Sequence, residues 1–413
     1  MRKIVFLGVV LSCGLAWAAD PAAWDQWRGP ARDGTLPSGA AVWPDDLGEN
    51  HLQRVWRRGL DEGYSTPIVT PDRVFTVETV DNKREVVRAF GLADGQEVWN
   101  TNWTGAMQVP FFARRNGSWV RSSPAFDGSS LYVGGMRDLL VCIDPTTGRE
   151  RWRVDFMQRY KTPLPDFGFV SSPLVDGEFV FAQAGASLVK LDRRTGDEVW
   201  RTLADGGGMF GSAFSSPMIA TLHGQRQLVV QTRAKLAGVN MDDGTVLWSV
   251  DVPAFRGMNI LNPTVRGNQV FTSSYGGGAF LFDILKDGKG WSARQAWKTK
   301  TEGYMASPVV LDGHIYLHRR DRRVSCIEWA TGREAWTSDE RFGQYWSMLT
   351  DGRRILALDQ KGELLLVEAT PREMKIVARR TVSAEETWAH LAAMGDYLVI
   401  RELKGVSVWR WKR

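Results

Sequence analysis

The chain of 413 residues is 43% hydrophobic and 24% charged, and its formal net charge is +5. These values are typical of a globular protein, and they exclude a disordered chain, a collagen-like fibre and a small disulfide scaffold. Tryptophan is unusually abundant, with 19 residues against 18 Phe and 8 Tyr, which indicates a motif that reuses it.

An export signal is predicted over residues 1–18. Two basic residues precede an apolar run over Ile4 to Leu15 that is too short to span a membrane, and Ala16-Trp17-Ala18 is a small-x-small cleavage site. We expect cleavage after Ala18. The alternative is a lipoprotein anchored through Cys13. Without this leader the formal net charge falls from +5 to +3, because the leader contains two cations and no acid.

The remaining composition argues against two classes of partner. A net charge of +3 gives little reason to expect nucleic-acid binding, although local basic patches can still attract anionic partners. No later segment approaches eighteen uninterrupted apolar residues, so no transmembrane segment is expected.

One phrase recurs along the chain: an apolar strand, a glycine turn, and a tryptophan four residues after the glycine. It is clearest in CIDPTTGRERW and KLDRRTGDEVW. The repeat tryptophans are Trp56, Trp99, Trp152, Trp200, Trp248, Trp297 and Trp336. Their six intervals average about 47 residues, a period typical of β-propeller blades rather than of helical repeats. We expect these side chains to pack between blades rather than to bind a ligand.

Each repeat is predicted to form four antiparallel strands. A Ser-Pro strand comes first, an Asp-Gly turn leads to the second strand, and a Thr-Gly turn joins the third strand to the Trp strand. Two weaker units follow Trp336, which makes eight blades. The last unit lacks an outer strand, and the strand around Trp56 can supply it. The sequence therefore predicts an all-β, eight-bladed propeller closed by this N-terminal strand, which removes two exposed edges.

The xTGxxxW phrase with its preceding Ser-Pro strand resembles the repeat of PQQ-like β-propellers. That family includes quinoprotein alcohol dehydrogenases and the BamB-type scaffold of outer-membrane protein assembly. The resemblance covers roughly residues 51 to 411. We therefore expect a lead-in segment over 19–50 and a single propeller domain over 51–413. Within the lead-in, DQWRGPARDG (Asp25 to Gly34) is similar to the openings of exported bacterial members.

The resemblance to quinoproteins implies a PQQ site, in which a Trp and a disulfide of adjacent cysteines hold the quinone beside a calcium ion. In this chain no two cysteines adjoin. Cys142 and Cys326 each stand ten residues before a repeat Trp, so they occupy equivalent positions four blades apart, too far for a disulfide. No calcium ligands can be assigned. We therefore predict no cofactor, no metal and no catalytic residue. PQQ with calcium would be expected only if the protein were instead a small quinoprotein dehydrogenase.

The two faces of the predicted ring differ in loop length. The 1–2 and 3–4 turns are tight and share one face, whereas the 2–3 turns and the inter-blade crossings share the other, which carries the long connections. Aromatic and Arg residues on long loops of a rigid scaffold are typical of a recognition surface. The candidate partner or ligand contacts are Phe111, Phe112, Arg114, Arg115, Arg256, Tyr304, Arg319, Trp346 and Trp388.

These patterns predict an exported, periplasmic, monomeric protein without catalysis of its own. It resembles BamB-type envelope proteins, and it would act as a scaffold or binding module that recognises a protein or a small ligand on the long-loop face. The alternative is a small PQQ-dependent dehydrogenase, or another propeller enzyme with an axial pocket. Two structural readings of the loops also remain: the aromatics only cap or plug the channel, and the Arg run over 319–323 is a solvated hairpin.

Overall fold

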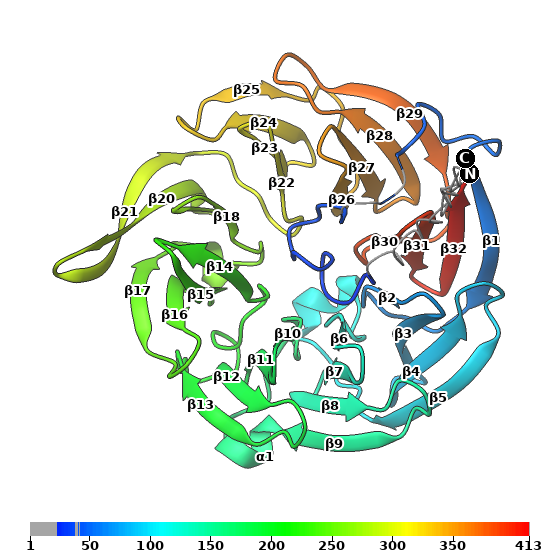
Figure 1. The fold of residues 1–413 in the computed structure, drawn as a ribbon, viewed down its shortest axis with the longest axis horizontal. Coiled ribbons are helices and arrows are strands. Elements are labelled where there is room, and N and C mark those ends of the chain that lie inside the picture. The colour runs from blue at the N-terminus through cyan, green and yellow to red at the C-terminus, as the bar shows by residue number, and fades with distance from the viewer. Residues whose placement is uncertain (1–22, 38–39, 41, 413) are drawn as a thin grey trace, which may run out of the picture.

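The repeats fold into a closed ring of eight four-stranded antiparallel sheets around a central axis (Figure 1). This computed structural model describes residues 23–37, 40 and 42–412. The predicted signal peptide and Cys13 lie outside these residues. Within the described ranges, no helix is both long enough and apolar enough to cross a membrane.

The first four blades follow the chain directly, with the innermost strand first. Blade 1 consists of β2 (Ile68–Val69), β3 (Arg73–Val80), β4 (Arg84–Gly91) and β5 (Glu97–Thr104). Blade 2 consists of β6 (Ala125–Phe126), β7 (Leu131–Gly135), β8 (Leu139–Ile143) and β9 (Glu150–Asp155). Blade 3 consists of β10 (Leu174–Asp176), β11 (Phe179–Ala184), β12 (Ser187–Asp192) and β13 (Glu198–Thr202). Blade 4 consists of β14 (Met218–Leu222), β15 (Gln225–Gln231), β16 (Lys235–Asn240) and β17 (Val246–Asp251).

The last four blades continue the pattern until the final blade borrows a strand. Blade 5 consists of β18 (Thr264–Arg266), β19 (Gln269–Ser274), β20 (Gly278–Asp287) and β21 (Gly290–Thr299). Blade 6 consists of β22 (Val309–Leu311), β23 (His314–His318), β24 (Val324–Glu328) and β25 (Glu334–Thr337). Blade 7 consists of β26 (Trp346–Thr350), β27 (Arg354–Asp359), β28 (Glu363–Glu368) and β29 (Lys375–Thr381). Blade 8 consists of β30 (Ala392–Met394), β31 (Tyr397–Glu402), β32 (Gly405–Trp411) and β1 (Leu52–Gly59).

The ring closes as predicted. Strand β1 pairs antiparallel with β32, from Leu52 opposite Trp411 to Gly59 opposite Gly405. The two strands lie side by side at the periphery in Figure 1 although they come from opposite ends of the chain. This pairing covers the outer edge of β32 and gives blade 8 the same four strands as the other blades, so only short, protected outer edges remain.

The repeat tryptophans join neighbouring blades. Six of the seven indole N–H groups donate to a backbone carbonyl of the next blade, over 2.8–3.1 Å. The turn glycine makes this contact possible. At Gly148, where φ is 73°, an added Cβ would lie 2.6 Å from the ring of Trp99. The exception is Trp248, which donates to Gln227 within its own blade.

The Ser-Pro phrase forms a ring of hydrogen bonds around the axis. The residue before each proline donates its backbone N–H to the side-chain oxygen of the equivalent residue in the next blade, over 2.9–3.1 Å. The residues in order are Thr66, Ser123, Ser172, Ser216, Asn262 and Ser307. His390 of blade 8 extends the ring by donating to Thr66. Short hydroxyl and amide side chains therefore hold the innermost strands together.

The lead-in segment enters the central channel, where Figure 1 shows it in dark blue inside the ring. Backbone bonds join Trp24 to Val69 of blade 1 and Leu36 to Thr350 of blade 7. Between these points, Arg28 donates to the carbonyl of Pro308, and Arg32 donates to that of Pro173. The segment thus ties blades on opposite sides of the axis together.

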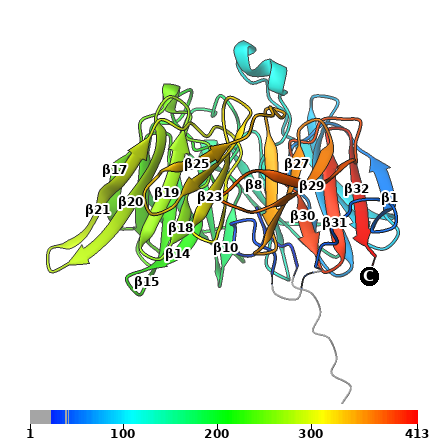
Figure 2. The ribbon, with the colours of Figure 1, turned by 90° about the horizontal axis from the view of Figure 1, so that it is seen from above.

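The connections are distributed between two faces. Figure 2 shows the short helix η1 (Phe111–Asn116), in cyan, rising above one face of the ring, while the lead-in lies toward the other. Two other short helices, α1 (Phe156–Tyr160) and η2 (Phe255–Gly257), also follow outer strands and belong to inter-blade crossings. We call the face that carries η1 the upper face.

Candidate functional site

An axial cavity of about 190 Å³ opens among the inter-blade crossings. Every blade contributes to its wall through the segment that enters its innermost strand. The lining residues, in blade order, include Tyr64, Arg121, Ser172, Ser216, Asn262, Tyr304, Tyr345 and Trp388. Trp27 of the lead-in also lines the cavity, so the segment that plugs the channel provides its floor. The cavity is thus a cup rather than a through-channel.

Aromatic rings dominate the wall of this cup. Tyr64 stacks on Trp388 with ring centroids 5.2 Å apart, and Tyr345 lies 6.1 Å from the same tryptophan. On another part of the wall, Phe167 and Phe214 meet edge to face at 5.3 Å. Burial raises the pKa of the Tyr64 and Tyr345 hydroxyls well above its ordinary value. Both tyrosines therefore stay neutral at physiological pH and act as hydrogen-bonding groups.

Two of the candidate contacts from the sequence, Tyr304 and Trp388, lie in the wall of the cavity, and Tyr64 and Tyr345 hold the positions equivalent to Trp388 in blades 1 and 7. All four line the cavity. Trp346 does not. It is 1% exposed, and its ring contacts His318 and Phe342 in the core between blades 6 and 7.

The position of Trp346 corrects its assignment as a partner contact. Successive side chains of a strand point to opposite sides, so when Tyr345 faces the axis its neighbour faces the adjacent blade. Burial also lowers the pKa of the His318 imidazole beneath Trp346 to about 4. That histidine is a neutral core residue at neutral pH.

The helix η1 presents four of the predicted contacts to solvent on the upper face. Phe111 is 80% exposed and Phe112 is 49% exposed, and Arg114 and Arg115 are also exposed. The ring centroid of Phe112 is 6.3 Å from that of Phe167, which lines the cavity, so Phe112 lies beside the cavity rim. Neither arginine forms an ion pair among the described residues.

Arg256 lies on another crossing of the upper face, next to Phe255. Its guanidinium carbon is 5.3 Å from the Phe255 ring, which is 48% exposed. Phe255 contacts Tyr275 at 4.9 Å, and Tyr275 contacts Tyr304 at 5.4 Å. An aromatic path therefore leads from this rim into the cavity.

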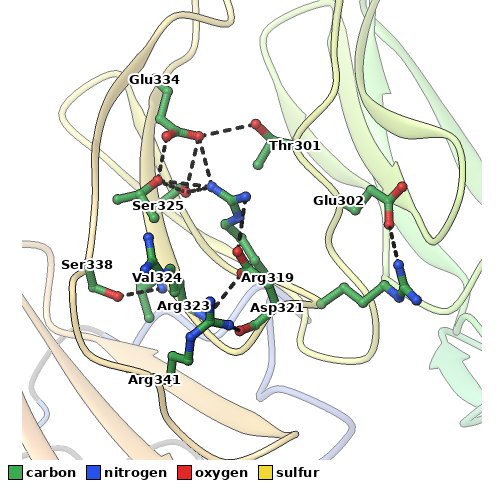
Figure 3. Close-up of polar contacts among 12 residues, drawn as sticks. Thr301, Glu302, Arg319, Asp321, Arg323, Val324, Ser325, Glu334, Ser338 and Arg341 are labelled. Atoms are coloured by element: carbon green, nitrogen blue, oxygen red, sulfur yellow. Dashed lines mark hydrogen bonds and ion pairs between the residues drawn. The ribbon is translucent and has the colours of Figure 1, made fainter.

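Arg319 is occupied by internal partners rather than directed at solvent. Figure 3 shows its guanidinium between Ser325, Glu334 and Asp321. The neighbouring Arg320 pairs with Glu302 and lies 3.9 Å above the ring of Tyr275. The Arg run over 319–323 is thus a hairpin braced by acidic neighbours, and Arg319 is the weakest of the predicted contacts.

The sequence analysis missed two residues of this site. Trp27 belongs to a lead-in that has no repeat to place it. Arg121 stands two residues before a Ser-Pro step, the position equivalent to Tyr64, and only comparison of the blades reveals this.

The repeat pattern and the ring place the chain among known propellers. A family model described as outer membrane protein assembly factor BamB matches residues 83–338 and 292–397. The chain belongs to this family. The BamB of Nitrosomonas eutropha is 22% identical over 302 residues, which are 71% of this chain and 63% of that protein. The BamB of Yersinia pestis is 20% identical over 301 residues, 69% of this chain and 72% of that protein. The chain thus spans less than two thirds of the first relative.

Solved structures show the same BamB-like fold. BamB from Moraxella catarrhalis superposes with a TM-score of 0.64 at 16% identity, covering 88% of this chain and 98% of that one. Quinohemoprotein alcohol dehydrogenase ADHIIG from Pseudomonas putida HK5 superposes with a TM-score of 0.60 at 13% identity. The match covers 94% of this chain and 80% of that one. At these identities the likeness is one of fold.

The quinoprotein likeness can be tested on the residues of the cavity. Cys142 and Cys326 are free and buried in the third strands of blades 2 and 6, away from its wall. The lining contains no carboxylate, and within the described ranges no three His, Cys, Asp or Glu side chains gather around a possible metal position. These residues do not fit a quinone held by a disulfide with calcium beside it.

Proposed function

We propose that this BamB-like propeller is an exported binding module that docks a protein partner on its upper face in the cell envelope. The observation that supports the proposal is the distribution of exposed aromatic rings. Among the described residues, the exposed aromatic side chains are Phe111, Phe112, Phe210 and Phe255. All four lie on inter-blade crossings of this one face. Exposed aromatics gathered on a single surface are typical of protein interfaces.

Charge indicates the chemistry of the partner. Arg114, Arg115 and Arg256 are exposed beside these rings and form no ion pair within the described part of the chain. An acidic surface with apolar side chains would satisfy both the rings and the free cations. Because the relatives are named outer membrane protein assembly factors, a component of that assembly machinery is the first partner to examine.

Site-specific photo-crosslinking in the envelope tests this proposal. A photoreactive residue at Phe111 is expected to crosslink to one specific envelope protein, whereas one at Val98, 45% exposed on the outer strand β5, is not. The triple variant Phe111→Ser, Phe112→Ser, Phe255→Ser should then lower the affinity of the purified pair by at least about tenfold, since interface aromatics are common hot spots.

A matched variant controls for loss of apolar surface in general. Val55→Ser, Val98→Ser and Val199→Ser remove exposed apolar side chains from three outer strands and should leave the affinity unchanged. Equal crosslinking at Phe111 and Val98, or equal loss of affinity in the two triple variants, would contradict docking on the upper face.

A further inference from the structure

Four arginine side chains surround the axial cavity without a counter-ion. Arg121 lines its wall, and Arg233 lies 4.2 Å over the ring of Phe214, which also lines it. Arg28 and Arg32 lie in the plug, next to the floor residue Trp27. None of the four forms an ion pair among the described residues.

These guanidinium groups are satisfied only by uncharged acceptors. Arg28 donates to two backbone carbonyls, Arg121 to two, and Arg233 to three. Arg32 donates to two carbonyls and to the amide oxygen of Gln26. These acceptors engage part of each guanidinium but do not cancel its positive charge, and the Nε–H groups of Arg28, Arg32 and Arg121 have no partner among the described residues. Buried charges of one sign are costly unless an opposite charge joins them.

Burial is the main influence on the pKa values of these four arginines, and it lowers each of them. It lowers the pKa of Arg28 to about 10, that of Arg32 to about 9 and that of Arg233 to about 10. Arginine side chains stay protonated in proteins at neutral pH, so these groups carry positive charge. The cavity therefore has four guanidinium charges around it, none of them in an ion pair among the described residues.

Nearby acids compensate these charges only in part. Asp33 lies near Arg28, and Asp25 lies near Arg32. Burial raises the pKa of the Asp25 carboxyl to about 6, so it is mostly ionised at neutral pH but forms no ion pair with Arg32. Asp205 and Asp166 lie near Arg233 without pairing with it, and Glu386 acts on the Tyr64 hydroxyl. None of these carboxylates lines the cavity.

The cavity also holds hydrogen-bond donors without partners. Asn262 is 3% exposed, and its Nδ2 has no acceptor although its Oδ1 accepts the backbone N–H of Ser216. The indole N–H groups of Trp27 and Trp388 are likewise buried and unpartnered. Buried donors in native proteins nearly always have a partner, so the three donors around this cavity are available to a ligand that accepts hydrogen bonds.

The size of the cavity limits the ligand. An engineered protein cavity of roughly 150 Å³ holds benzene, so a cup of about 190 Å³ has room for one substituted ring. Tyr64, Tyr345 and Trp388 offer ring faces and edges for it to pack against.

We propose that the axial cup is a binding site for a small organic anion, in which one apolar or aromatic ring carries a carboxylate. The ring packs against the aromatic wall. The carboxylate accepts hydrogen bonds from Asn262 and the indole groups in the field of the four arginines. This site borders the protein-docking surface, since η1 contributes to the cavity wall, but the contacts proposed for the anion do not depend on protein docking.

Paired probes that differ only in charge test the proposal. Phenylacetate and phenylacetamide have nearly the same shape, and calorimetry on the purified full chain gives both dissociation constants. We expect phenylacetate to bind at least tenfold more tightly and to raise the melting temperature in proportion to its occupancy. Equal affinity for the two probes, or no binding of phenylacetate at millimolar concentration, would overturn the proposal.

Two variants locate the site. Asn262→Asp keeps the oxygen that holds Ser216 but replaces the unpartnered donor by a negative charge, so phenylacetate affinity should fall at least tenfold. The new carboxylate supplies the missing counter-ion, so the melting temperature without ligand should rise. Arg372→Gln, on the exposed turn between β28 and β29, should change neither value. If Asn262→Asp binds phenylacetate like the parent protein, the site is not in the cup.

A variant of the wall gives an independent measurement. Arg121→Gln retains an amide donor for the carbonyl of Gly117 but removes the charge. It should weaken phenylacetate binding without changing phenylacetamide binding. Loss of both by the same factor would indicate a collapsed cup and would count against charge recognition. Unchanged partner crosslinking in the presence of phenylacetate would show that the two sites are independent.

Discussion

At the scale of single residues, this propeller buries ionisable groups that set its response to pH. Asp138 is 1% exposed and accepts the backbone N–H of Gly185 across the boundary between blades 2 and 3. Burial raises the pKa of this carboxyl to about 7, and the neighbouring Asp155 and Asp205 add to the effect. The folded protein therefore holds this proton at pH values where the unfolded chain has released it.

This linkage predicts a loss of stability with rising pH. The stabilisation is fully present below the unfolded pKa near 4 and declines until the pH passes about 7. Asn tolerates the positive φ of 57° at this position and retains the acceptor oxygen. Asp138→Asn should therefore become more stable relative to the parent by up to about 4 kcal/mol between pH 4 and pH 7. Denaturant unfolding at several pH values measures it.

The control for this experiment is an exposed carboxylate. Asp339 is exposed and takes part in no ion pair among the described residues. Asp339→Asn should leave the pH dependence of the unfolding free energy unchanged. Parallel pH profiles for the parent protein and Asp138→Asn would refute the assignment of the proton to Asp138.

Strand register decided which candidate contacts reach the cavity. Tyr304 and Trp388 line the cup, whereas Trp346 does not. A one-residue shift separates Tyr345, which faces the axis, from Trp346, which faces the core. The positions of Arg233 and Trp27 at the cavity could not be predicted. The cavity forms where segments distant in sequence meet, and no local sequence pattern indicates which segments these are.

At the scale of elements, the contact between an outer-strand tryptophan and the next turn glycine joins the blades. Gly148 and Gly128 both have positive φ, 73° and 90°. Only Gly148 has a ring against it, whereas an added Cβ at Gly128 would meet nothing within 4 Å. Both Ala substitutions incur backbone strain, but Gly148→Ala must also displace Trp99.

The difference between the two variants isolates the docking contact. Gly148→Ala should lower the unfolding free energy by about 1–3 kcal/mol more than Gly128→Ala does. Thermal and denaturant unfolding of both proteins measure the difference. Equal destabilisation by the two substitutions would contradict this. It would mean that the Trp99 ring moves aside without cost and that the positive φ alone requires glycine at position 148.

These contacts also explain why the elements were predictable. The Gly, Trp and Pro residues of each repeat are the residues that the turn, the docking contact and the hydrogen-bonded inner ring require. The sequence therefore carries the blade count and the strand order directly. Blade 7 has no repeat tryptophan on β29, and its assignment rested on its Asp-Gly turn and strand alternation.

At the scale of the whole molecule, closure and plugging are separate functions of the N-terminal region. Strand β1 completes blade 8, and the lead-in fills the channel. A chain that begins at residue 51 lacks only the plug, and one that begins at residue 61 also lacks β1.

We expect the chain from residue 51 to stay folded without aggregating but with a lower melting temperature, because it loses the buried side chains of Trp24, Trp43 and Leu47. The chain from residue 61 should aggregate, because β32 then presents an open edge. Light scattering and circular dichroism distinguish these states. A monomeric, fully folded chain from residue 61 would mean that β1 is dispensable for closure.

The path of the lead-in also orients the molecule. Trp24 and Asp25 bond to the ends of β2 and β6, beside the short 1–2 turns. Figure 2 shows the dark-blue lead-in toward the face opposite the cyan helix η1. Any tether attached upstream of Trp24 would therefore leave from beneath the ring. A propeller attached in this way would direct its upper face, with the four exposed phenylalanines, away from the point of attachment. A second protein could then approach that face freely.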